Sequence, residues 1–392
     1  MLFRATSSLP GTEPQQPLAS EAMARRCTSM SFCYVNLCKS FPRDALGRIP
    51  ELLGTQEVTI ANTARHRRAP AWAISLCTLL PWVAACGASL DAGYDKPHGL
   101  LPVDARNPIV LCNDGVYDNW AGEYAALFAS SGALSLAGIV ISTGSNDATN
   151  LDDNMTGWRQ MVTAARGGGL QNIPDPMASS GSVLVRPSDG NIDSTTANRS
   201  EGAHFILDTS AQLSQPYRPL VVVTGGRLTD VADAYLMDPT LPERIVVVSS
   251  LGTTSTDGAQ MGPPNGEMDK WADVIVAQKF RYVQISSFYD QMNDVSDSLV
   301  PQLPQNTFTS WIEAKRTKIY DDVLAADQGA VVAVAVPEFV AAVSRAALSD
   351  TSTPALSSDP NGPIWLVTHV SGAVATARLW NMLLDPTMFH SQ

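Results

Sequence analysis

The sequence is poor in positive charge and in cysteine, and each deficit excludes a class of protein. Lys and Arg together number 26 against 38 Asp and Glu, which gives a net charge of −12. A nucleic-acid-binding protein needs a basic surface, so this balance argues against one. The six cysteines include no Cys-x-x-Cys pair, which argues against a structural zinc site. Only two of them lie beyond residue 85, so no disulfide framework holds the larger part of the chain together.

The positive charge that is present is concentrated near the N-terminus. Residues 1–85 hold nine Lys or Arg and five Asp or Glu, whereas residues 86–392 hold 17 and 33. The basic stretch 65–69 precedes an uncharged, mostly apolar run of 15 residues over 71–85. A basic stretch, an apolar run and small residues at its end are typical of a secretory signal. The run is shorter than the roughly 20 residues that a membrane-spanning helix needs.

The segment Val83–Cys86 also resembles the bacterial lipobox, whose cysteine is acylated. This similarity implies a lipid anchor on Cys86 at the cell envelope, and Gly87 favours the outer membrane; a plain signal peptide is the alternative. We therefore expect four parts in the chain. They are a non-native or disordered extension over 1–64 with the true start near Val58, a signal peptide over 65–85, the lipidated cysteine with a tether over 86–106, and a folded domain over 107–392.

Short apolar runs and amphipathic stretches alternate along the acidic part of the chain. The runs are rich in β-branched residues and continuous, as in strands buried on both faces. Such alternation predicts an α/β fold, a doubly wound, mostly parallel sheet with helices on both faces and a Rossmann-like core. Strands are expected at 109–112, 136–142, 220–224, 244–250, 282–285, 330–336 and 364–368. Helices are expected at 120–130, 155–166, 202–213, 230–236, 269–279, 311–327, 338–348 and 373–384.

Polar residues follow several of these strands, where open α/β sheets bind their ligands. Four segments resemble motifs of the inosine/uridine-preferring nucleoside hydrolases, and they occur along the chain in the family's order. Cys112–Asn119 is similar to the family's Asp-x-Asp-Pro-Gly-x-Asp-Asp loop, and Gly226–Ala232 to its Gly-Pro-Leu-Thr-Asn-x-Ala turn. Asn265–Ala272 is similar to Asn-x-x-x-Asp-x-x-Ala, and His369–Ala375 to His-Asp-Pro-Leu-Ala-Val-Ala.

The resemblance implies a hydrolase of N-glycosidic bonds in nucleosides or related N-ribosyl compounds at the cell envelope. Its partners would be a small nucleoside or N-glycoside and the membrane, with homo-oligomer formation left open. N-glycoside hydrolysis needs an activated water and protonation of the leaving base, which a carboxylate and an imidazole supply. The implied roles are Asp114 as base and metal ligand, His369 as proton donor, Asp118, Asn146, Asn265 and Asp269 as substrate-binding residues, and Asp114, Asn119 and the Thr229 carbonyl as ligands of Ca²⁺.

Three departures from the family pattern weaken the expected calcium site and sugar contact. Asn119 and Val370 stand where the family has carboxylates, and Pro263 stands where it has a glutamate. Because Ca²⁺ prefers about six to eight oxygen ligands, the site should bind it weakly unless other aspartates take part. A non-catalytic nucleoside- or sugar-binding lipoprotein with the same fold is therefore the alternative function. At helix starts, Asp114, Asp118, Asn265 and Asp269 can equally be helix caps.

Overall fold

The computed structural model describes residues 96–115, 119–144, 151–255, 265–285, 302–319 and 327–385. The expected N-terminal extension, the signal peptide and the lipidated Cys86 lie outside these residues, and so do Asp118 and Asn146. The described residues belong to one compact unit within 84–392. Leu101 and Val103, in the expected tether, are buried in its core, so the folded domain begins before residue 107.

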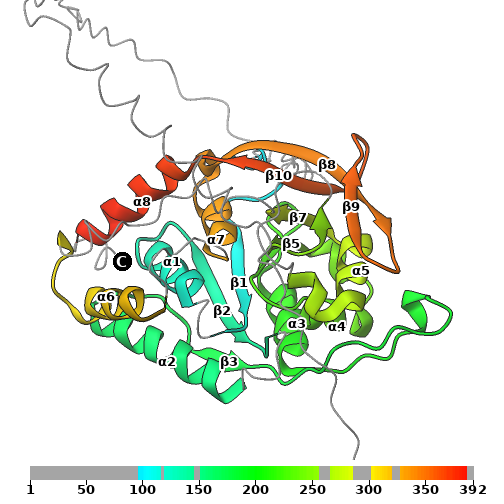
Figure 1. Ribbon diagram of the computed structural model, residues 1–392, viewed down its shortest axis with the longest axis horizontal. Helices are drawn as coiled ribbons and strands as arrows, with labels where there is room; N and C mark the ends of the chain where they lie inside the picture. Colours follow the sequence, from blue (N-terminus) through cyan, green and yellow to red (C-terminus); the bar gives the residue numbers. More distant parts are fainter. Residues whose placement is uncertain are drawn as a thin grey trace, which may run out of the picture. The chain divides into compact units, whose positions relative to one another are not determined.

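Ten strands among the described residues form one sheet, in the order β3-β2-β1-β4-β5-β7-β10-β8-β9-β6 (Figure 1). The seven strands from β3 to β10 run parallel, and β8 and β9 add antiparallel pairs. This confirms the predicted α/β fold with a mostly parallel sheet. The strands are β1 Pro108–Asn113, β2 Ser135–Ile141, β3 Pro176–Ala178, β4 Leu220–Thr224, β5 Ile245–Ser250, β6 Thr254–Ser255, β7 Arg281–Ile285, β8 Val340–Asp350, β9 Ala355–Ser358 and β10 Ile364–Val370.

Helices cover both faces of the sheet, as the sequence predicts. One core cluster joins the sheet to α1, α2, α6, α7 and α8, and a second joins its other face to α3, α4 and α5 (Figure 1). Their bounds are α1 Asn119–Ser130, α2 Leu151–Gly167, α3 Glu201–Leu213, α4 Thr229–Met237, α5 Lys270–Lys279, α6 Thr307–Ile319, α7 Gln328–Ala335 and α8 Gly372–Leu384. Short 3₁₀ helices are η2 Ile192–Ser194, η3 Leu241–Glu243, η4 Asn265–Asp269 and η6 Pro337–Phe339. No helix of the described ranges is long and apolar enough to cross a membrane.

The central strands are continuous apolar runs because both of their faces are covered. All five residues of β4 are buried, with Val221 and Val223 in one core cluster and Leu220 and Val222 in the other. Strands of a parallel sheet with helices on both faces are buried on both sides, so their sequences are continuously apolar and do not alternate between apolar and polar residues. The order β3-β2-β1-β4-β5-β7 makes β1 and β4 the topological switch point of the sheet, because the strands next to them lie on opposite sides. Open α/β sheets bind ligands in a crevice at the carboxyl ends of the strands at such a point.

Two of the predicted elements are wrong. The run 330–336 was expected to be a strand, but it belongs to α7, all of whose residues are buried. A short run that is apolar on every side does not distinguish a buried helix from a buried strand. Residues 338–348 were expected to be a helix and instead form η6 and most of β8. Here pairing with β9 and β10 overrides the helix preference of an alanine-rich segment.

Candidate active site

Asp114 lies directly after β1, at the carboxyl edge of the sheet. Its side chain is buried, and its residue is 3% exposed. The Asn113 side chain accepts a hydrogen bond from the backbone N–H of Asp114 over 2.7 Å, and the Asp114 carboxylate accepts one from the N–H of Gly115 over 2.7 Å. These local bonds hold the carboxylate at the end of β1, beside the crevice where doubly wound sheets bind ligands.

The turn after β4 brings its backbone against this carboxylate. The N–H of Gly225 donates to the carbonyl of Cys112 over 2.9 Å, which ties the turn to β1. A Cβ atom at Gly226 would lie 3.0 Å from Cγ of Asp114, and one at Gly225 would lie 2.5 Å from Cγ of Asp327. The two glycines are therefore required by close approach to the two carboxylates.

Asp327, just before α7, is a candidate site residue that the sequence analysis missed. It is 5% exposed, and its carboxylate accepts hydrogen bonds from the side-chain amides of Asn113 and Asn265, each over 3.4 Å. Burial raises its pKa most, and the nearby charge of Asp114 raises it further, whereas Ser250, Asn113 and Asn265 lower it by less. Two buried carboxylates thus lie near each other, and such a pair favours either a bound proton or a bound cation.

A sequence signal for Asp327 exists. Asp327–Val332 reads Asp-Gln-Gly-Ala-Val-Val and aligns with the Asp-Pro-Leu-Ala-Val-Ala part of the family's His-Asp-Pro-Leu-Ala-Val-Ala, with Ala326 at the histidine position, whereas 369–375 has Val370 at the aspartate position. The expectation of a strand over 330–336 concealed this match. Because Asp327 lies near Asp114, we match the pattern to 326–332 instead.

The segment first matched to that pattern lies elsewhere in the sheet. Val370 ends β10 and is buried in the core cluster, and the His369 side chain is exposed. Strand β10 is four places from β1 in the sheet, and at about 4.8 Å per strand this is roughly 19 Å. The structure therefore does not bring His369 to the end of β1.

Asn265 and Asp269, at the two ends of η4, have different surroundings. Asn265 donates from its side chain to the Ser250 carbonyl over 2.9 Å as well as to Asp327, which places it at the carboxylate pair. Asp269 caps α5 by accepting from the N–H of Ala272, and it also accepts from the Thr229 hydroxyl over 2.7 Å. Asp269 is thus a helix cap that positions the start of α4.

A second buried carboxylate group fixes residues 179–200, which we call the strap. Asp230 accepts from the hydroxyls of Ser179 and Ser200, each over 2.7 Å, and Asp233 accepts from the N–H of Ser200 over 2.7 Å. The Arg227 guanidinium donates to the Gly181 carbonyl over 2.9 Å, and its charge opposes the rise in the pKa of Asp230 that burial causes. The strap is therefore attached to the same turn and helix that follow β4.

The described residues at the carboxylate pair fit a hard cation such as Ca²⁺. They supply two carboxylates, and a cation between the carboxylates would offset their repulsion. The Thr224 hydroxyl oxygen, at the end of β4, is buried without a protein partner. No group of three or more His, Cys, Asp or Glu side chains within the described ranges is arranged to hold a metal. The side chains of Asp118 and Asn119 lie outside that description.

Comparison with solved structures connects this fold to one enzyme family. The chain is similar to the inosine-uridine preferring nucleoside hydrolase from Bacillus anthracis, with a TM-score of 0.51, 16% identity, and coverage of 73% of this chain and 100% of that one. An inosine-guanosine nucleoside hydrolase is similar with a TM-score of 0.54 and 18% identity, over 70% of this chain and 98% of that one. A plant nucleoside hydrolase is similar with a TM-score of 0.50 and 15% identity, over 71% of this chain and 100% of that one. No family model and no curated protein sequence matches the chain. At these identities, the likeness shows the fold.

Proposed function

We propose that this chain hydrolyses the N-glycosidic bond of nucleosides or related N-ribosyl compounds. The observation that carries the proposal is the buried pair Asp114 and Asp327 at the switch point between β1 and β4, within a fold similar to that of nucleoside hydrolases. The Asp114 carboxylate would accept the proton of the attacking water. The amides of Asn113 and Asn265 hold Asp327 in place beside it.

We further propose that the pair holds Ca²⁺. Asp114 and Asp327 would be its carboxylate ligands, and the Thr229 carbonyl and Asn119 remain the other expected ones. When bound, the cation would polarise a water molecule and sugar hydroxyls. Asp327 removes the main reason to expect a weak site, because it supplies the carboxylate that Val370 lacks. The substrate contacts proposed for Asp118 and Asn146 fall outside the described residues.

The cell envelope remains our proposed location, on the sequence argument alone. Lipidation of Cys86 would place two acyl chains on the mature N-terminus, and two chains give stable anchoring where one does not. Replacing Cys86 by serine should release the protein into the soluble fraction or leave it unprocessed. Unchanged partition of the Cys86→Ser protein into membranes would contradict the anchor.

A non-catalytic nucleoside- or sugar-binding protein is the second candidate. The observation that favours it is the exposed His369, far along the sheet from Asp114, because the expected proton donor is then missing from the described part of the site. A binding protein would keep the carboxylate pair for sugar hydroxyls and release no ribose.

Release of ribose from inosine and uridine distinguishes the two candidates. We expect turnover by the wild-type protein and a loss of about 10²–10⁴ in rate for Asp114→Asn, since one acid–base group is removed. Asp153→Asn, an exposed carboxylate on α2, is the matched control and should keep the wild-type rate. Binding of a nucleoside by calorimetry without any ribose release would favour the binding protein.

A further inference from the structure

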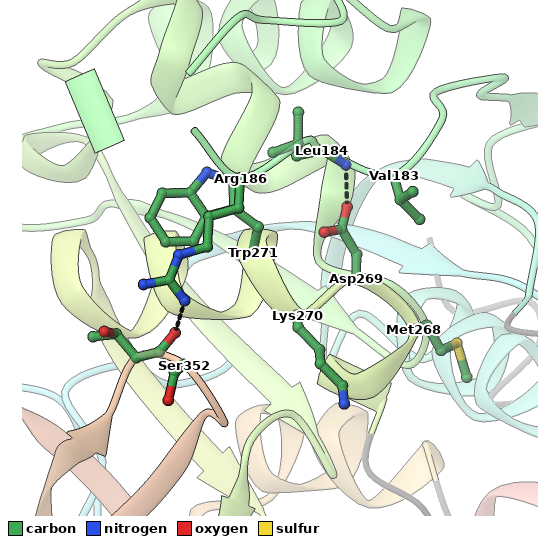
Figure 2. Close-up of a pocket in the computed structure, with 9 residues that line it drawn as sticks. Val183, Leu184, Arg186, Met268, Asp269, Lys270, Trp271 and Ser352 are labelled. Atoms are coloured by element: carbon green, nitrogen blue, oxygen red, sulfur yellow. Dashed lines mark hydrogen bonds between the residues drawn. The ribbon is translucent and has the colours of Figure 1, made fainter. Parts of the chain in front are cut away.

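A cavity with a volume of about 260 Å³ lies beside the first turn of α5. Its walls come from three segments: the strap, the junction of η4 and α5, and the turn between β8 and β9 (Figure 2). The lining residues that matter here are Leu184, Arg186, Asp269, Lys270, Trp271 and Ser352. The mechanism proposed above uses none of them directly.

The pocket carries two positive charges. The Arg186 guanidinium lies 4.9 Å from the centre of the Trp271 ring and donates to the Thr351 carbonyl over 2.6 Å (Figure 2). These two contacts fix the guanidinium while leaving other N–H donors free, because the group has five. Lys270 makes no hydrogen bond or ion pair with the described part of the chain, so its ammonium charge is available to a ligand.

The nearby carboxylates are already engaged. Figure 2 shows the Asp269 side chain directed at the backbone of Leu184, whose N–H donates to it over 2.9 Å. The Asp269 carboxylate also accepts hydrogen bonds from the Thr229 hydroxyl and the Ala272 N–H, so its oxygens are occupied. Asp350, which lies near Arg186, accepts from both the N–H and the hydroxyl of Ser352. Among the lining residues, two side chains are cationic, Arg186 and Lys270, and one is acidic, Asp269, so the lining has a net positive charge. Asp269 already caps the N-terminus of α5. Binding of an anion in the pocket would therefore depend on the side chains of Arg186 and Lys270 and not on the helix terminus.

The pocket is also close to the carboxylate pair along the chain. The 3₁₀ helix η4 runs from Asn265, which contacts Asp327, to Asp269, which lines the pocket. At about 2.0 Å of rise per residue, its two ends are roughly 8 Å apart. The pocket thus begins roughly 8 Å along the backbone from the residue that contacts Asp327.

We infer that this pocket binds the phosphate group of a substrate whose sugar lies at the carboxylate pair, so that the chain acts on a phosphorylated N-glycoside. The inference rests on the proposed function for the position of the sugar. Lysine binds phosphate as a compact charge, and the planar guanidinium of arginine matches two phosphate oxygens. The volume holds several times the roughly 30 Å³ of one water, which suits a phosphate with its adjoining carbon and not a polymer.

Calorimetry with the full-length protein tests the pocket. Inorganic phosphate, ribose and ribose 5-phosphate are titrated into wild-type protein, Lys270→Ala and Lys279→Ala. Lys279 lies at the other end of the same helix, against Tyr235, and serves as the matched control. We expect ribose 5-phosphate to bind about tenfold or more tightly than ribose, as one charge-assisted contact allows. Lys270→Ala should lose this gain, and Lys279→Ala should keep it.

Equal affinity of the wild-type protein for ribose and ribose 5-phosphate would overturn the inference, as would equal losses in the two lysine variants. Binding of inorganic phosphate without a gain for the sugar phosphate would also overturn it, because the pocket would then be separate from the sugar site. A failed pocket and a failed function are distinguishable. Ribose release from nucleosides with no phosphate gain removes only the pocket, whereas tight sugar-phosphate binding without any turnover removes only the hydrolase.

Discussion

The carboxylate of Asp327 lies close enough to that of Asp114 for the charge of Asp114 to raise its pKa. Asn113, next to Asp114 in the chain, links the two residues because its side-chain amide donates to Asp327 over 3.4 Å. Burying two like charges is unfavourable unless a proton or a cation compensates them. This pair is therefore the chemical centre of the proposed site.

Val370→Asp should destabilise the protein and leave its calcium affinity unchanged. Val370 is 2% exposed and packs in the core, so an aspartate there would bury an unpaired charge. We expect a loss of about 3 kcal/mol or more in the free energy of unfolding, measured by denaturant titration. Val370→Ala, which removes only methyl groups, is the control and should lose less. A rise in calcium affinity on Val370→Asp would restore position 370 as a ligand site.

Gly226→Ala should slow turnover with little change in melting temperature. The added Cβ would lie 3.0 Å from Cγ of Asp114 and 3.2 Å from its backbone N, so Asp114 must shift by a few tenths of an ångström. Gly226 does not have a positive φ, so alanine brings no backbone strain. We expect kcat/KM to fall about tenfold or more, since small misplacements of catalytic groups are costly. An unchanged rate would mean that the turn does not position Asp114.

Asp273→Asn should flatten the dependence of stability on pH. Burial raises the pKa of Asp273 from 3.8 to about 7, although the Thr253 hydroxyl donates to it over 2.6 Å. The folded state therefore binds this proton more tightly than the unfolded state, and stability that is present below about pH 4 is lost as the pH rises to 7. Melting temperatures at pH 5 and pH 8 should differ less in Asp273→Asn than in wild type. Asp208→Asn, on the exposed side of α3, should behave like wild type.

His369→Ala should keep kcat/KM for nucleosides within about twofold of wild type. Loss of a catalytic proton donor would instead lower the rate by about 10²–10⁴. The side chain is exposed on β10, four strands from β1. A large loss on inosine, with full activity on nitrophenyl riboside, would return His369 to the role of proton donor. That substrate has an activated leaving group and needs no protonation.

The sequence predicts the sheet and its active edge well, because buried parallel strands are short, continuous and β-branched. It places Asp114 and the glycine turn before Thr229 at strand ends and Asn265 at a helix start, and the structure brings Gly226 against Asp114 and Asn265 against Asp327. It fails at α7 and β8, where burial on all sides and strand pairing override the local signal. Because of that failure the sequence analysis missed Asp327. Ligand residues are expected after a strand, whereas Asp327 comes before a segment that was expected to be one.

Calcium-dependent ribose release is the measurement that tests the central claim most directly. Full-length wild type and Asp327→Asn are depleted of metal with a chelator and assayed on inosine and uridine while Ca²⁺ is added back. The account predicts that wild-type activity is lost on depletion and returns with Ca²⁺, and that Asp327→Asn needs at least about tenfold more Ca²⁺ or stays inactive, because a charged ligand is removed. Ribose release by Asp327→Asn at the wild-type rate and calcium concentration would contradict it.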